Sequence, residues 1–291
     1  MLNLEEVSRF DNLLIFAKSV VDGYFSGRHK ARSFGSSSQF KDYKAYQQGD
    51  ELCNIDWRLY AKTQRLYTRR YDNETDMVIY LLVDMSASMG YGEKVSKTLL
   101  ASQIAAALNY LMINQGDKVS LILFDTKIRE YFPPGSTRSH MYSSIKAMEN
   151  AEPSMQTDLV NTLHECHALF KKRGRLIVLS DFWGSDAALF DALSLFLHRR
   201  FEVLLMQVLD DEELRLPQYD NVRFVDMETK EQIQVEPDEI RSYYKKNMQS
   251  FLDQMAQDSE GRKISYSLLS TKHPYLEAIE SYLGFRKGEH R

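Results

Sequence analysis

The spacing of hydrophobic residues changes near residue 77, and the change separates two kinds of pattern. Before it, apolar residues recur every three or four positions over residues 3–25, which predicts an amphipathic helix. Alternating side chains over residues 65–71 predict a short strand. After it, short and nearly continuous apolar runs alternate with helical patterns. This alternation is typical of a parallel sheet that helices cover on both faces.

The elements predicted after residue 76 follow the order expected of such a sheet. The predicted strands cover residues 77–83, 119–124, 128–132, 175–180, 201–209 and 264–269. The predicted helices cover residues 93–115, 138–148, 158–172, 186–199, 237–261 and 273–283. We therefore predict an α/β fold with a doubly wound, mostly parallel sheet over residues 76–291. A hairpin insertion is expected near residues 220–236, and residues 1–75 are expected to form a small, β-containing elaboration that packs on the core.

Composition excludes several classes of protein. The chain has 291 residues, of which 43% are hydrophobic and 27% charged, as in ordinary globular proteins. A net charge of −4 argues against binding of nucleic acid by the protein as a whole. No apolar run approaches the roughly 20 residues that span a bilayer. Two cysteines, Cys53 and Cys166, and an amino end unlike a signal peptide predict a cytoplasmic protein without a membrane span.

Polar side chains follow the predicted strands where ligands usually bind in open α/β sheets, beyond the carboxyl ends. An Asp-x-Ser-x-Ser sequence follows the first predicted strand, an aspartate follows the strand over residues 175–180, and a threonine precedes the helix that begins at residue 158. All of these are hard oxygen donors, which suit Mg²⁺, with Mn²⁺ or Ca²⁺ as alternatives. The predicted metal ligands are Asp84, Ser86, Ser88, Thr157 and Asp181.

The same residues allow a plainer interpretation, and they also limit the chemistry. Thr157 could cap the helix that begins at Asp158, and Asp181 could cap a turn. If a dication does bind, two carboxylates leave it incompletely neutralised, so an open coordination position would attract a carboxylate from outside. No histidine or lysine is obviously placed to act as a base, so we expect a binding protein and not an enzyme.

These five residues resemble the complete metal-ion-dependent adhesion site of von Willebrand factor type A domains. The resemblance rests on their order and on their places at strand ends and in loops. It implies a doubly wound sheet in which Ser86, Ser88 and Thr157 coordinate the metal directly. It further implies that Asp84 and Asp181 bind directly or through water, and that a protein partner supplies an Asp or Glu.

The upstream region resembles a narrower family, the bacterial domain of unknown function 58. The resemblance is carried by Phe40-Lys-Asp-Tyr-Lys-Ala-Tyr46, Gly49-Asp50, Ile55-Asp56-Trp57-Arg58 and Ala61-Lys62-Thr63. Many members are encoded beside MoxR-type AAA+ ATPases, which implies that such an ATPase is a partner and that this chain is an adaptor for an unknown protein client. The chain departs from the family pattern at Gln39, Cys53-Asn54 and Lys62, where Glu, Arg and Arg are usual.

Two features of the upstream region leave alternatives open. Asp56, Trp57 and Arg58 could contact a partner, or Trp57 could anchor the segment onto the sheet with the two charged residues paired around it. The stretch of residues 58–70 contains basic and aromatic residues but no acid, which could bind nucleic acid, although a solvated surface fits the acidic chain better.

Three functions compete on this sequence. The first is a metal-dependent protein-binding adaptor, which we favour. The second is a phosphatase with an aspartyl-phosphate intermediate, which would need an Asp-x-Asp sequence where this chain has Ser86. The third is a scaffold in which the metal site has lost its function and the upstream segment binds the partner. A zinc site at His164 and His167 lacks a third ligand, so we reject it.

Overall fold

The computed structural model describes residues 12–28, 40–47, 55–71, 77–92, 95–154, 156–184, 187–216, 222–225, 232–235, 237–272 and 274–288. These residues divide into two compact units. The larger unit consists of residues up to Arg28 together with those from Val78 onward, and the smaller unit lies between His29 and Met77.

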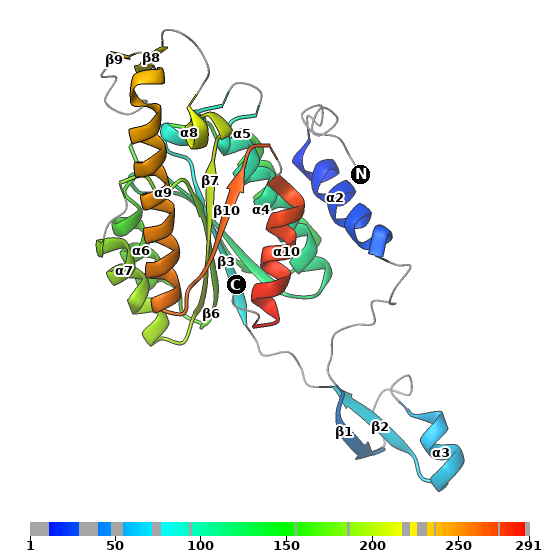
Figure 1. Ribbon diagram of the computed structural model, residues 1–291. Helices are drawn as coiled ribbons and strands as arrows, with labels where there is room; N and C mark the ends of the chain where they lie inside the picture. The colour runs from blue at the N-terminus through cyan, green and yellow to red at the C-terminus, as the bar shows by residue number, and fades with distance from the viewer. Residues whose placement is uncertain are drawn as a thin grey trace. The chain divides into compact units, whose positions relative to one another are not determined.

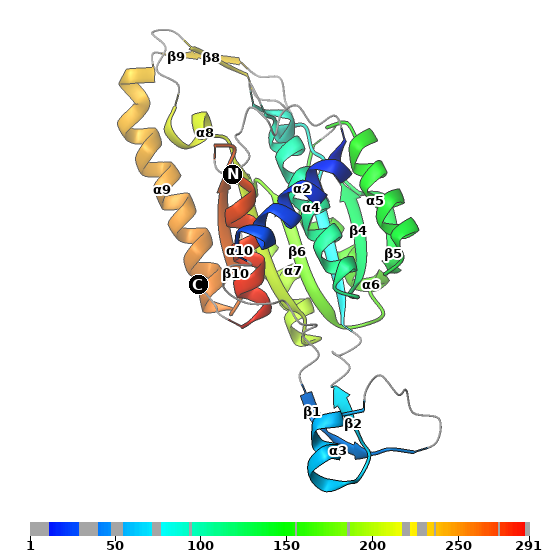
Figure 2. The same ribbon diagram turned by 90° about the vertical axis from the view of Figure 1, so that its right-hand side faces the viewer.

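A sheet of six strands forms the centre of the larger unit within the described residues. Its strand order is β10-β7-β6-β3-β4-β5, and every pairing is parallel except that between β4 and β5 (Figures 1 and 2). The strands are β3 (Val78–Asp84), β4 (Lys118–Phe124), β5 (Ile128–Gly135), β6 (Gly174–Ser180), β7 (Glu202–Leu209) and β10 (Ser265–Ser270). The predicted strands of the sheet are therefore confirmed, and the edge strand β5 is antiparallel.

Helices cover both faces of this sheet (Figures 1 and 2). One face packs against α4 (Lys97–Asn114), α5 (Arg138–Asn150) and α10 (Pro274–Arg286), and α2 (Leu13–Arg28) packs on the outer side of α4. The other face packs against α6 (Leu159–Leu169), α7 (Ala187–His198) and α9 (Pro237–Gly261). The doubly wound α/β class is confirmed. No helix among the described residues combines the length and apolarity needed to cross a membrane.

The central strand β3 shows why the apolar runs form this sheet. All of its residues are buried. Ile79 and Leu81 face the core cluster under α4, whereas Tyr80 and Leu82 face the cluster under α6 and α7. A strand covered on both faces needs apolar side chains at every position, so its hydrophobic pattern is continuous and does not alternate.

Helix α2 belongs to the larger unit, which corrects the predicted grouping of this helix with residues up to 75. Leu13, Ala17 and Val21 of α2 are buried in the same cluster as α4. The Leu13 amide also donates a hydrogen bond to Glu149 Oε1 on α5, at 2.7 Å. Helix α4 therefore lies between the sheet and α2, which explains why it is buried on almost every side.

Several short elements among the described residues were not predicted from the sequence, whereas the hairpin was. In the smaller unit, β1 (Phe40–Ala45) pairs antiparallel with β2 (Tyr67–Tyr71), and the helix α3 (Trp57–Thr63) lies between them in the chain. Strand β1 and α3 were missed. In the larger unit, the short helix α8 (Asp211–Arg215) was also missed. The predicted hairpin is confirmed as β8 (Val222–Val225) paired antiparallel with β9 (Gln232–Val235).

The close approach of β3 and β6 gives a direct test of this packing. A Cβ atom at Gly174 would lie 1.8 Å from the backbone oxygen of Val78, so we expect Gly174→Ala to force the two strands apart. The expected loss is about 1–3 kcal/mol in the free energy of unfolding, measured by urea denaturation. Gly261→Ala is the control, because nothing lies within 4 Å of its added Cβ. Equal stability of the two variants would contradict the described strand pairing.

Candidate functional site

The predicted site residues lie at the carboxyl edge of the sheet. Asp84 is the last residue of β3, and Asp181 follows β6, its parallel neighbour. Carboxyl ends of adjacent parallel strands meet at one edge, so the two aspartates are brought together by the pairing itself. Ser86 and Ser88 lie in the turn after β3, where η2 (Ser88–Gly90) begins. Thr157 precedes Asp158, which caps the amino end of α6.

The carboxylate of Asp84 is the centre of a network of short contacts. Its Oδ1 accepts a hydrogen bond from the Ser86 amide at 2.8 Å. Its Oδ2 accepts one from Ser180 Oγ at 2.6 Å and a longer one from Thr157 Oγ1 at 3.3 Å. Asp84 has no exposed surface. Burial, reinforced by the nearby charge of Asp181, raises the pKa of Asp84 to about 6.

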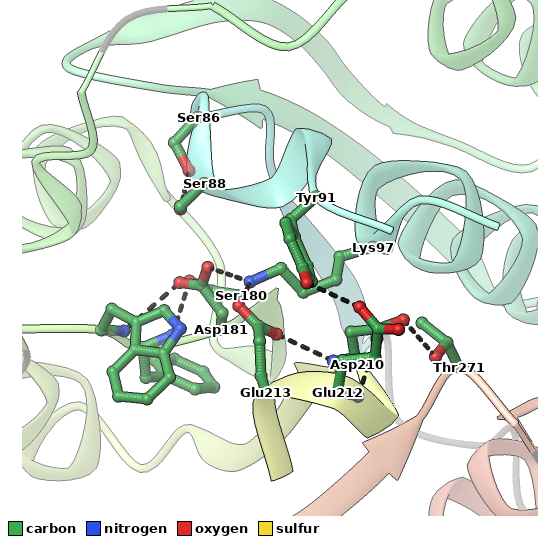
Figure 3. Close-up of polar contacts among 12 residues, drawn as sticks. Ser86, Ser88, Tyr91, Lys97, Ser180, Asp181, Asp210, Glu212, Glu213 and Thr271 are labelled. Carbon is green, nitrogen blue, oxygen red and sulfur yellow. Dashed lines mark hydrogen bonds and ion pairs between the residues drawn. The ribbon is translucent and has the colours of Figure 1, made fainter. Parts of the chain in front are cut away.

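The hydroxyl groups complete the oxygen-rich cluster. Ser86 Oγ and Ser88 Oγ lie 3.1 Å apart (Figure 3). Ser86 is buried, while Ser88 and Thr157 are partly exposed. The carboxylates therefore lie deeper than two of the hydroxyls, which leaves the cluster open on the side of Ser88 and Thr157. Ser180 was not among the predicted ligands, although it precedes Asp181 at the same strand end.

Asp181 is held by a turn with unusual backbone geometry. Its Oδ1 accepts a hydrogen bond from the Trp183 amide at 3.3 Å, and its backbone oxygen accepts one from Gln207 Nε2 at 2.8 Å. Phe182, the next residue, has a φ of 56°, in the left-handed region that non-glycine residues seldom adopt. A costly conformation that persists beside a buried carboxylate is typical of a functional site.

A buried lysine, which the sequence patterns did not predict, binds the other oxygen of Asp181. Lys97, in the first turn of α4, has no exposed side-chain surface. Its Nζ lies 2.8 Å from Asp181 Oδ2 and 2.6 Å from Glu213 Oε1 (Figure 3). Burial on its own would lower the pKa of Lys97, but the two carboxylates outweigh it and raise the pKa, so the side chain stays charged.

Glu213 belongs to a capped turn that ties α8 to the site. Asp210 caps α8, and Glu213 completes the capping box by accepting a hydrogen bond from the Asp210 amide at 2.8 Å. Burial raises the pKa of Glu213, although Lys97 opposes this shift. Tyr91, in the turn after η2, donates a hydrogen bond to Glu212 at 2.9 Å. Two separate polar contacts therefore connect the chain after β3 to α8: that of Tyr91 with Glu212 and that of Lys97 with Glu213.

The donor set suits a hard divalent cation. Two buried carboxylates lie close enough for Asp181 to raise the pKa of Asp84, so a cation between them would relieve their repulsion. Hydroxyl oxygens supply neutral ligands beside them. Among the described residues, no three His, Cys, Asp or Glu side chains gather as a metal site.

The predicted partner-binding residues Asp56, Trp57 and Arg58 lie in the smaller unit. Asp56 is only 4% exposed and caps α3, because its Oδ1 accepts hydrogen bonds from the amides of Arg58 at 2.9 Å and Leu59 at 3.0 Å. Trp57 is 62% exposed, and its ring meets Tyr60 edge-on. Within its own unit Trp57 is therefore a surface residue. Of the departures from the family pattern, Lys62 is exposed on α3, whereas Gln39, Cys53 and Asn54 lie outside the described residues.

The fold and the site together define a class of protein: a doubly wound α/β domain with an oxygen-rich polar cluster at the carboxyl edge of its sheet. The chain belongs to the family described as "Protein of unknown function DUF58", whose model matches residues 42–251. The matched region includes all five predicted metal ligands and both partners of Lys97.

Several proteins are similar to this chain. Uncharacterized protein Rv1480 of Mycobacterium tuberculosis is 27% identical over 221 residues, which cover 75% of this chain and 69% of the relative. The uncharacterized protein Mb1516 of Mycobacterium bovis has the same identity and coverage. Among solved structures, the conserved hypothetical protein BatB from Bacteroides thetaiotaomicron is 16% identical, with a TM-score of 0.49, over 72% of this chain and 99% of that chain. A von Willebrand factor type A protein from Catenulispora acidiphila is 13% identical, with a TM-score of 0.45, over 88% of this chain and 52% of that one.

The cap of α3 provides a test of the role of Asp56. Replacing it in Asp56→Ala removes both amide contacts, so we expect about 1 kcal/mol of lost local stability and faster hydrogen exchange over residues 57–63. Asp56→Asn is the control, because asparagine caps helices as well as aspartate does. Faster exchange in both variants, or in neither, would contradict a capping role.

Proposed function

We propose that the chain is a metal-dependent protein-binding module that has no catalytic activity of its own. Its metal is a divalent cation, Mg²⁺ before Mn²⁺ or Ca²⁺, held by Asp84, Ser86, Ser88, Thr157 and Asp181. The observation that carries the proposal is the convergence of two buried carboxylates and several hydroxyls from separate parts of the chain at one edge of the sheet. Thr157 and Ser180 bond to Asp84, Ser86 lies next to Ser88, and Asp181 follows the strand beside that of Asp84.

The partner is expected to bind through a carboxylate. Hydroxyl ligands add no charge, and Asp181 already shares its charge with Lys97, so a bound dication would remain electron-poor. Ser88 and Thr157 are partly exposed, and they mark the side from which an external ligand can approach. An Asp or Glu of the partner would then complete the coordination sphere.

Trp183 offers an apolar contact beside this approach. The residue is 36% exposed, and its ring stacks on Phe251 of α9, with centroids 5.1 Å apart and planes at 8°. A rigid, partly exposed aromatic side chain two residues after Asp181 can bury surface against a partner at little cost in conformational entropy. The metal would thus bind the acidic residue of the partner, and Trp183 would pack against the partner's residues next to that acidic residue.

A phosphatase remains the alternative from another class, and the site supports it less well. The residue two positions after Asp84 is Ser86, which cannot act as the second carboxylic acid of such enzymes. The lysine near the site is engaged by two carboxylates and fully buried, so its ammonium group is not available to a phosphate.

The wider role follows from the family resemblance. We infer that the ATPase partner is of the MoxR AAA+ type and that the chain acts as a cytoplasmic adaptor in the assembly or activation of a protein complex. Asp56, Trp57 and Arg58 remain candidates for a second contact, with exposed Trp57 better suited to this than capped Asp56.

Metal titration tests the first part of the proposal. We expect calorimetry to detect Mg²⁺ and Mn²⁺ binding to the wild-type protein, and Asp84→Asn or Ser86→Ala to weaken it on the order of tenfold or more, because each removes a ligand or its charge. Asp191→Asn, an exposed carboxylate on α7, is the matched control and should bind as the wild type does. Unchanged affinity in Asp84→Asn would place the metal elsewhere.

Partner capture tests the second part. The tagged protein should retain its client and an AAA+ ATPase from the cells that express it naturally when Mg²⁺ is present, and it should lose the client when EDTA is added. Ser86→Ala should lose the client even with Mg²⁺, whereas Asp191→Asn should keep it. A client that is retained equally in EDTA and by Ser86→Ala would favour the scaffold function instead.

A further inference from the structure

Lys97 is a fully buried cation placed between the candidate metal site and α8. We propose that Lys97 competes with the divalent cation for Asp181, and that α8 sets the strength of this competition through Glu213. The inference rests on the proposed metal-binding function and adds a means of regulating it.

The competition follows from the geometry. Lys97 Nζ lies 2.8 Å from Asp181 Oδ2, so the ammonium group occupies one side of a carboxylate that the metal also needs. Both side chains have no exposed surface, so water and salt screen the repulsion between the ammonium group and a nearby dication only weakly. Lys97 would therefore weaken the binding of a metal beside Asp181.

Glu213 reduces this effect because it draws the same ammonium group toward α8. Its Oε1 lies 2.6 Å from Lys97 Nζ, closer than Asp181 does. When a dication approaches Asp181, Glu213 can hold the displaced positive charge. When α8 moves away, Lys97 has only Asp181 as its carboxylate partner. Its ammonium group then neutralises part of the negative charge that the metal would need.

Helix α8 is anchored to elements outside the site, so their movement can reach Lys97. Tyr244 of α9 donates a hydrogen bond to the Glu213 backbone oxygen at 2.6 Å. Thr271, after β10, donates one to Asp210 Oδ2, the cap of α8, at 2.6 Å (Figure 3). A partner that displaces α9 would move Glu213 and so change the affinity of the metal site.

A purely structural role for the same ion pairs predicts something different. If Lys97 only braces α4 against β6 and α8, then removing either of its ion pairs should loosen the site and weaken metal binding. If it competes with the metal, removing Lys97 should strengthen binding, and removing Glu213 should weaken it. The sign of the change therefore separates the two roles.

The test is a calorimetric titration of Mn²⁺ into four proteins, with near-ultraviolet circular dichroism to establish that each is folded. We expect Lys97→Met to bind Mn²⁺ on the order of tenfold more tightly than the wild type, and Glu213→Gln several-fold more weakly. Arg215→Met is the matched control, because Arg215 is also a cation and lies on α8 with Glu213. Its side chain is 75% exposed and therefore screened by solvent. Its affinity should stay within about twofold of the wild type.

Each outcome decides the inference. If both Lys97→Met and Glu213→Gln weaken binding, or neither changes it, Lys97 is only a structural brace and the inference is overturned, while the metal site stands. If Lys97→Met does not fold, Lys97→Gln, which removes the charge but can still hydrogen-bond both carboxylates, decides in its place: tighter binding supports competition, and weaker or unchanged binding overturns it. If Lys97→Met binds Mn²⁺ and the wild type does not, the inference holds. If neither binds, both the inference and the proposed function are wrong.

Discussion

The burial of two carboxylates at one edge of the sheet is the constraint on which the rest of the site depends. Asp84 ends β3, Asp181 follows the adjacent parallel strand β6, and neither has exposed surface. Each needs compensation, because a buried charge without partners is strongly destabilising. Asp84 obtains it from hydroxyl and amide donors, and Asp181 from Lys97. This division leaves Asp84 short of positive charge, which is the basis for proposing a cation.

Much of the fold and the core of the site could be predicted because they depend on local patterns. Continuous apolar runs such as that of β3 mark strands covered on both faces, and residues that follow such strands gather at one edge. The sequence alone therefore predicts that Asp84 and Asp181 lie together. It also predicts that Thr157 lies beside them, and Thr157 Oγ1 does lie 3.3 Å from Asp84.

The missed features depend on contacts between distant parts of the chain. Lys97 lies in the first turn of α4, and its burial depends on Asp181 and on α8, which follow much later in the sequence. Glu213 lies 116 positions away from Lys97, and no periodicity links the two. Helix α3 was missed for another reason: its start depends on the Asp56 cap, within a stretch without helical hydrophobic spacing.

The central claim is that a dication binds among the oxygens around Asp84. Anomalous X-ray diffraction from crystals grown with Mn²⁺ would locate the ion directly. The account predicts a single strong peak within coordination distance of Ser86 Oγ, Ser88 Oγ and Thr157 Oγ1, between the carboxylates of Asp84 and Asp181. A crystal in which Mn²⁺ is absent from this cluster, with Thr157 and Ser180 still bonded to Asp84, would contradict it.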